Sequence, residues 1–210
     1  MLVLLIAGGV TTAVLMNNST STAAPPTTVA PTTAAPAPTQ TEPPEYAGKL
    51  QDLVVPKPAS AVLTPSERKG DPDGSMNAQQ VASEYSDSGD SNAVLRDLGT
   101  LEFRRGVFLA WRDNGTLVYI QIYQFRYERE AVNWMVSVQH SLGGIATSRA
   151  VFDEIKDGRW YVTKTPDGRG GAHAIYNKGP FAVMIDTFRA GAADLDGTKK
   201  MAVEQFAKLP

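Results

Sequence analysis

Few residues in this chain have the types and spacing that catalysis or metal binding requires. Its two histidines, His140 and His173, lie far apart, and neither belongs to a helical His pair of the kind that binds zinc. The sequence has no cysteine, which excludes disulfides, thiolate metal ligands and a cysteine nucleophile. A nucleophile elbow, a phosphate-binding loop and a dinucleotide fingerprint are also missing. The sequence therefore predicts no cofactor, no metal site and no recognisable catalytic set.

Carboxylates are the remaining side chains that could carry a reaction. Acid–base catalysis needs two carboxyl groups in one cleft with unequal environments. Asp186 is the acid inside an apolar run, MIDTF, where partial burial would disfavour its charged form. With Glu154 it defines an alternative hypothesis, an envelope hydrolase or transferase that uses carboxylates. The simpler interpretation pairs Asp186 with an arginine near the end of a strand.

The strongest local folding signal is a β-hairpin over residues 105–127. Two β-rich runs flank Asn114-Gly115, the pair that best suits a type I′ turn. A two-residue turn gathers six apolar side chains on one face, because directly opposed residues point to the same side of the sheet. The predicted pairs are Val107 with Ile122, Leu109 with Ile120, and Trp111 with Val118.

The opposite face of this hairpin mixes aromatic and polar side chains. Tyr, Arg and Phe are favoured at protein interfaces, so this face is the candidate binding surface. The alternative is that this face is buried, because a hairpin with apolar side chains on both faces is typically packed against other elements on both sides of the sheet. The candidate binding residues are Arg112, Tyr119, Gln121, Tyr123 and Phe125.

The N-terminal part of the chain predicts a membrane attachment. Residues 1–16 carry no charge and are typical of a signal anchor or a truncated signal peptide. As a helix they span about 24 Å, less than the roughly 30 Å of a hydrocarbon core, so we expect more of this segment before Met1. Residues 17–45, rich in Thr, Ala and Pro, predict a disordered stalk, because they cannot bury enough apolar surface to offset their ordering entropy. We therefore expect a single-pass membrane protein whose C-terminal domain is extracytoplasmic, or a secreted protein if the leader is cleaved.

The remaining residues predict one α+β domain. Residues 46–75 form a lead-in, and the domain spans residues 76–210. Short turns between the last strands imply antiparallel neighbours, so we expect an antiparallel sheet of about six strands with a central crossover helix, a C-terminal helix, and one or two short helices first. The expected helices are 77–86, 93–98, 128–142 (ended by Gly143-Gly144) and 196–209, and the strands after the hairpin are 149–155, 159–165, 172–177 and 181–189.

Spaced single residues accompany this order of elements. Phe103, Gly106 and Trp111 lie along one expected strand, and Ala202 and Gln205 form an Ala-x-x-Gln pair in the closing helix. In these features the chain, over about residues 75–209, resembles the small extracytoplasmic domains of actinobacterial surface proteins, many of which stand on a membrane helix or lipid anchor and a Pro/Thr stalk. More distantly, the element order is similar to PsbP-like α+β domains. The resemblance implies no assigned reaction and no catalytic residue, and the chain lacks the lipobox cysteine of a lipoprotein.

Charge and organisation together define the expected function. The formal net charge is −2 and no Lys or Arg cluster is present, which argues against a nucleic-acid partner. We expect a non-catalytic cell-envelope binding or accessory module on a flexible stalk, with an envelope protein, glycan or lipid as its partner. The alternatives are the carboxylate enzyme described above and a structural or regulatory partner of a neighbouring membrane protein.

Overall fold

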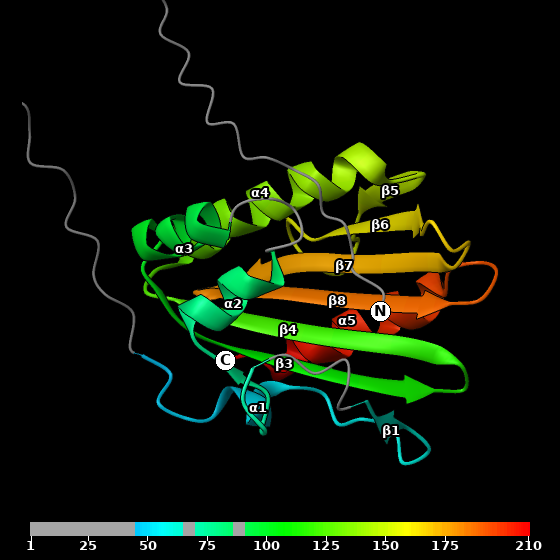
Figure 1. Cartoon of the computed structure of the whole chain (residues 1–210), viewed down its shortest axis with the longest axis horizontal. Coiled ribbons are helices and arrows are strands. Elements are labelled where there is room, and N and C mark those ends of the chain that lie inside the picture. The colour runs from blue at the N-terminus through cyan, green and yellow to red at the C-terminus, as the bar shows by residue number, and fades with distance from the viewer. Residues whose placement is uncertain (1–44, 65–69, 86–90) are drawn as a thin grey trace, which may run out of the picture.

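The computed structural model describes residues 45–64, 70–85 and 91–210, which form one antiparallel sheet with helices on both faces (Figure 1). The predicted membrane segment and nearly all of the predicted stalk lie outside the described residues. The predicted α+β class is confirmed. Among the described residues, no helix combines the length and the apolar character that crossing a membrane requires.

The elements follow the expected order, with three additions in the lead-in. These are α1 and the two-residue strands β1 and β2, which bring the sheet to eight strands instead of about six. The bounds are α1 Leu50–Leu53, β1 Val62–Leu63, β2 Ser75–Met76, α2 Ala78–Glu84, α3 Ser91–Thr100, β3 Phe103–Asp113, β4 Thr116–Phe125, α4 Glu128–Ile145, β5 Ser148–Val151, β6 Arg159–Lys164, β7 Gly170–Lys178, β8 Phe181–Arg189 and α5 Leu195–Lys208.

The strand order in the sheet is β1-β3-β4-β8-β7-β6-β5, and β2 also pairs with β3. Helix α4 carries the chain from β4 across the sheet to the far edge at β5. From there three hairpin connections bring it back, so that β8 completes the sheet by pairing with β4. The last strand of the sequence therefore lies in the middle of the sheet.

The predicted hairpin is confirmed in its turn and its register. Val107 pairs with Ile122, Leu109 with Ile120 and Trp111 with Val118. Asn114 and Gly115 have φ angles of +46° and +79°, the left-handed values that a type I′ turn requires.

The two faces of the sheet are covered by different helices (Figure 1). We call them the α5 face, covered by α5 and α1, and the α4 face, covered in part by α4, α2 and α3. Trp111, Ile120 and Ile122 lie in the core of the α5 face, with Ala202 of α5. Trp134 and Met135 of α4 pack on the other face, and the hairpin is buried from both sides.

The lead-in is tied to the C-terminal helix by hydrogen bonds to its backbone. The buried Gln205 amide accepts from the Val55 N–H at 2.9 Å and donates to the Leu53 carbonyl at 2.7 Å. Lys208 Nζ adds a bond to the Val54 carbonyl at 2.9 Å. Because the side chains of Leu50 and Leu53 are buried in the same core, this segment is an integral part of the fold.

Helix ends differ from the prediction where glycines were expected to stop a helix. Helix α4 runs through Gly143 and Gly144 to Ile145, and the Ala146 N–H donates to the Leu142 carbonyl at 2.9 Å. Helix α3 likewise continues past residue 98, where it was expected to end, and includes Gly99. None of these three glycines has a positive φ, so none forms the left-handed cap on which the prediction rested.

Candidate functional site

The candidate site lies on the α4 face, where four strands place chemically capable side chains in one row. Strand register sets Tyr119 of β4 opposite Asp186 of β8, Asp186 opposite His173 of β7, and His173 opposite Tyr161 of β6. Directly opposed residues of antiparallel strands point to the same face. Residues that are distant in sequence therefore become lateral neighbours.

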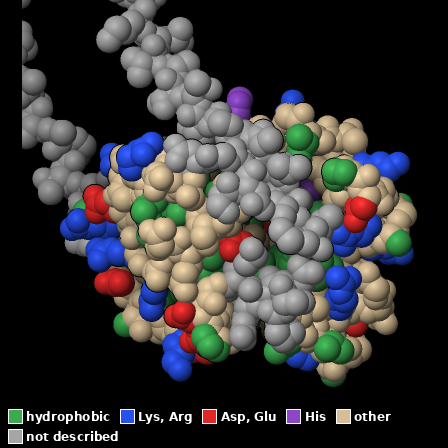
Figure 2. All heavy atoms as spheres, viewed as in Figure 1, with side chains coloured by type: hydrophobic (Ala, Val, Ile, Leu, Met, Phe, Trp, Pro, Cys, Tyr) green, Lys and Arg blue, Asp and Glu red, His purple; other side chains and the backbone are tan. Residues whose placement is uncertain are grey.

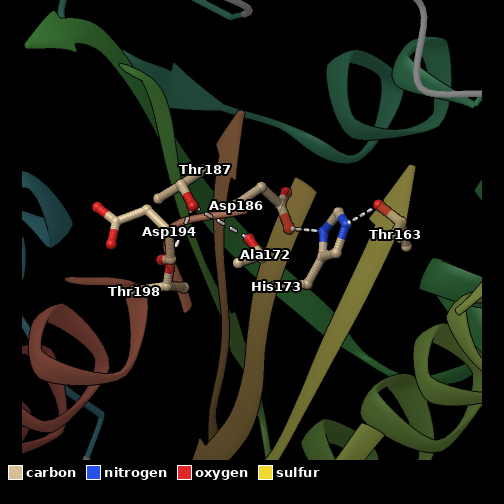
Figure 3. Close-up of polar contacts among 7 residues, drawn as sticks. All are labelled: Thr163, Ala172, His173, Asp186, Thr187, Asp194 and Thr198. Atoms are coloured by element: carbon tan, nitrogen blue, oxygen red, sulfur yellow. Dashed lines mark hydrogen bonds and ion pairs between the residues drawn. The ribbon is translucent and has the colours of Figure 1, made fainter. Parts of the chain in front are cut away.

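The imidazole and the carboxylate of this row are linked to the hydroxyl of Thr163, which lies two residues after Tyr161 on β6 (Figure 3). His173 Nδ1 lies 2.7 Å from Asp186 Oδ1, and His173 Nε2 lies 2.8 Å from Thr163 Oγ1. With Asp186 ionised, Nδ1–H donates to the carboxylate, and Nε2 of the neutral ring accepts the Thr163 proton. The His173 side chain is fully buried, whereas the Asp186 side chain is 9% exposed.

Neighbouring residues hold His173 in place. The Phe188 ring meets the imidazole edge-on, with centroids 5.5 Å apart. A Cβ on Gly171 would lie 2.5 Å from Thr163 Oγ1 and 3.1 Å from His173 Nε2. Only glycine therefore leaves room for this contact.

A second polar chain lies on the opposite face and has a structural role (Figure 3). Thr187 Oγ1 lies 2.6 Å from Thr198 Oγ1, and the Thr198 hydroxyl donates to the Asp194 carbonyl at 2.6 Å. Asp194 is the N-cap of α5, and its side chain accepts from the Gly197 N–H. These contacts attach the start of α5 to β8.

The structure divides the predicted binding surface into a buried part and an accessible part. Tyr123 and Phe125 are each 1% exposed and pack in the core of the α4 face. Tyr119 and Gln121 are half-buried, and Arg112 is exposed. Only the part of this hairpin face nearer the β3–β4 turn is therefore available to a ligand.

The amide of Gln121 has a fixed orientation. Tyr123 Oη donates to Gln121 Oε1 at 2.6 Å, and a side-chain hydrogen bond links Tyr123 to Tyr85, which follows α2. Burial raises the pKa of Tyr85 above its usual 10.0, and the charges of Asp186 and Glu84 raise it further. Burial also raises the pKa of Tyr123. Both phenols therefore remain neutral hydrogen-bonding groups, close to the Asp186 carboxylate.

The two predicted catalytic carboxylates are not brought together. Glu154 is exposed in the loop after β5, and its neighbours Phe152 and Ile155 pack in the core of the α5 face. Asp186 lies on the α4 face and pairs with His173, not with an arginine. Within residues 45–64, 70–85 and 91–210, no three His, Asp or Glu residues are grouped so that they could hold a metal ion.

Comparisons with known proteins give no evidence about function. No family model matches the chain, and no curated protein matches it. Among solved structures, the extracellular domain of PknH from Mycobacterium tuberculosis is similar at a TM-score of 0.37 and 12% identity, over 54% of this chain and 70% of that chain. A likeness this weak carries no argument about function.

Proposed function

We propose that this chain is a non-catalytic binding module, held outside the membrane on its N-terminal stalk, whose ligand contacts the α4 face at Tyr119 and Gln121. One observation carries the proposal. The half-buried Gln121 amide is held by Tyr123 beside a half-buried aromatic ring and a carboxylate that His173 fixes. Polar groups that are oriented before a ligand arrives lower the ordering cost of binding.

The extracytoplasmic location is proposed from the sequence of residues 1–45. An uncharged apolar segment followed by a Pro/Thr/Ala-rich stretch is typical of an anchored and displayed domain. Fusion of alkaline phosphatase to the C-terminus tests this, because that enzyme is active only outside the cytoplasm. A second fusion carries β-galactosidase, which is active only in the cytoplasm. An inactive alkaline phosphatase fusion together with an active β-galactosidase fusion would contradict the proposed location.

Capture from envelope extract tests the binding function. The full chain in detergent should retain an envelope component, and Gln121→Ala should reduce its recovery about tenfold, since the oriented amide is lost. His140→Ala is the control, because His140 is exposed on α4 and is expected to be solvated. Equal recovery by wild type and Gln121→Ala would remove the proposed surface from consideration.

The Thr163–His173–Asp186 chain favours a second candidate, acyl transfer with Thr163 as nucleophile. The connectivity of hydroxyl, imidazole and carboxylate is that of a nucleophile, its general base and the residue that orients the base. Thr163 is only 5% exposed and His173 is fully buried, so a substrate carbonyl has little access. Labelling by a fluorophosphonate that disappears in Thr163→Val would support this candidate, and an unlabelled native chain would reject it.

A further inference from the structure

We propose that the ligand of the Tyr119–Gln121 surface is a neutral, hydroxyl-rich glycan. This inference rests on the proposed binding function and names its ligand class. Three groups carry it: the ring of Tyr119, the amide nitrogen of Gln121 and the carboxylate of Asp186. Strand register places Tyr119 directly opposite Asp186, and Gln121 lies two residues from Tyr119 on the same face.

The polar groups of this surface offer one donor and one acceptor side by side. Gln121 Oε1 accepts from Tyr123, so the amide nitrogen is the group left to donate to a ligand. Asp186 Oδ1 is engaged by His173, and the second carboxylate oxygen can only accept while the group is ionised. A hydroxyl both donates and accepts, so two neighbouring sugar hydroxyls satisfy both groups.

The aromatic group is held in a fixed position. The Tyr119 ring packs against Phe108 at 5.3 Å and against Phe188 at 5.8 Å between centroids. Tyrosine is enriched at interfaces because it combines an apolar ring with a polar hydroxyl, and such a ring can contact the C–H face of a pyranose. The hydroxyl edge of that sugar would then lie toward Gln121 and Asp186.

Other ligand classes fit these groups less well. A purely apolar chain would remove Gln121 and Asp186 from water without giving them partners, which is costly. A phosphate or carboxylate ligand would meet the Asp186 carboxylate. Figure 2 views the α4 face, on which Lys, Arg, Asp and Glu side chains are all present. The arrangement therefore favours an uncharged polar ligand.

Titration with short oligosaccharides tests the proposal. Mannotetraose, maltotetraose and chitotetraose are added separately to the full chain in a zwitterionic detergent, since sugar-based detergents would compete, and binding is measured by isothermal titration calorimetry. We expect at least one to bind, with affinity reduced about tenfold or more in Gln121→Ala and in Tyr119→Ala, and retained in Tyr119→Phe, which keeps the ring. Gln79→Ala, which removes an exposed glutamine from α2, is the matched control and should bind as wild type does.

Two results would overturn the glycan assignment. One is that the folded wild-type chain binds none of the three oligosaccharides. The other is binding that Gln121→Ala and Tyr119→Ala leave unchanged while both variants unfold as the wild type does. If Gln121-dependent capture from envelope extract persists without oligosaccharide binding, the glycan class is wrong and the binding function stands. If that capture is also absent, both proposals fail.

Discussion

At the scale of single residues, the pairing of His173 with Asp186 places a titratable couple inside a sheet. Removing a carboxylate and a polar imidazole from water is costly, and their short hydrogen bond offsets that cost only while both partners are present. Removing one partner leaves the other buried and uncompensated. We therefore expect the pair to couple β7 and β8 energetically.

A double-mutant cycle on this pair measures the coupling. His173→Leu should lower the free energy of unfolding by about 3–5 kcal/mol, because it leaves the Asp186 carboxylate without its partner. The double variant His173→Leu/Asp186→Leu should lose less than the sum of the two single variants, with an interaction energy above about 1 kcal/mol in urea unfolding. Additive losses would show that the two side chains are not coupled in solution.

Gly171 provides a second test at this scale. An added Cβ would lie 2.5 Å from Thr163 Oγ1 and 3.0 Å from Phe188 Cε1, so Gly171→Ala should lower the thermal midpoint and disturb the His173 ring. Gly144→Ala is the control. It lies within α4 with no atom near the added Cβ, and it should stabilise the chain by up to about 1 kcal/mol. If Gly171→Ala were as stable as wild type, the space beside the Thr163–His173 contact would accommodate a Cβ at residue 171.

The sequence places His173 and Asp186 inside two expected strands but could not pair them. The observed Lys178–Phe181 pair fixes the register that sets His173 opposite Asp186. The register of β6 on β7 depends on a longer connection around Pro166-Asp167-Gly168, so the contact of Thr163 could not be predicted either.

At the scale of elements, the buried Gln205 side chain joins the lead-in to α5 across 150 positions of sequence. Its amide satisfies one donor and one acceptor of a segment that has no strand partner there. Periodicity cannot predict this contact, because its partners are backbone groups. In the sequence Gln205 is visible only as part of an Ala-x-x-Gln pair, whereas the structure shows its two hydrogen bonds to the backbone of the lead-in.

Substitution of Gln205 should release the lead-in. Gln205→Leu keeps the volume but leaves the Val55 N–H and the Leu53 carbonyl without partners, which should cost about 2–4 kcal/mol. We expect faster proteolysis within residues 45–55 than in wild type, measured by limited digestion and mass spectrometry. Glu204→Leu, at the exposed neighbouring position, is the control. Equal digestion of all three chains would contradict the role of the clamp.

The β3–β4 turn gives another prediction for an element. Gly115 has a φ of +79° and no atom near an added Cβ, so Gly115→Val tests backbone strain alone. A β-branched residue resists this conformation, and we expect a loss of about 1–3 kcal/mol in thermal unfolding. Unchanged stability would show that the turn, and with it the assignment of the two hairpin faces, is wrong.

At the C-terminal end of α4, packing against the sheet outweighs the tendency of glycine to end a helix. Gly143 and Gly144 were expected to stop α4, yet the helix continues because Leu142 is buried against the sheet and the last turn still forms its hydrogen bonds. Tertiary packing outweighs the low helix propensity of two glycines. The start of α2 agrees to within one residue with the expected helix 77–86, and its capping box between Asn77 and Gln80 involves only neighbours in sequence.

At the scale of the whole molecule, buried tyrosines on both faces of the sheet should make the folded state less stable at alkaline pH. Burial raises the pKa of Tyr176 well above its usual 10.0, and its hydroxyl donates to the Ala202 carbonyl at 3.2 Å. The folded state keeps this proton when the unfolded state loses it, so the contribution is present below pH 10 and declines as pH rises above it. The same sign holds for Tyr123 on the other face.

Tyr176→Phe isolates this effect. Above pH 10 the free energy of unfolding of wild type should fall by up to about 1.4 kcal/mol per pH unit more steeply than that of the variant. Urea unfolding between pH 8 and about 11.5 measures the two slopes. Tyr127→Phe, which changes a half-buried tyrosine at the start of α4, is the control. Parallel curves for wild type and Tyr176→Phe would show that the Tyr176 phenol ionises freely in the folded chain.

The central position of β8 has a consequence for how this chain folds. The β3–β4 hairpin can form early from local contacts, but its open edge stays unpaired until α4 and three further strands have been made and β8 arrives. Contacts between distant parts of a chain slow folding, and an unpaired strand edge invites association with other chains. A chain that is synthesised from its N-terminus would therefore pass through a state in which the edge of β4 is exposed and unpaired. Slow elongation or crowding at that stage would favour association with other chains.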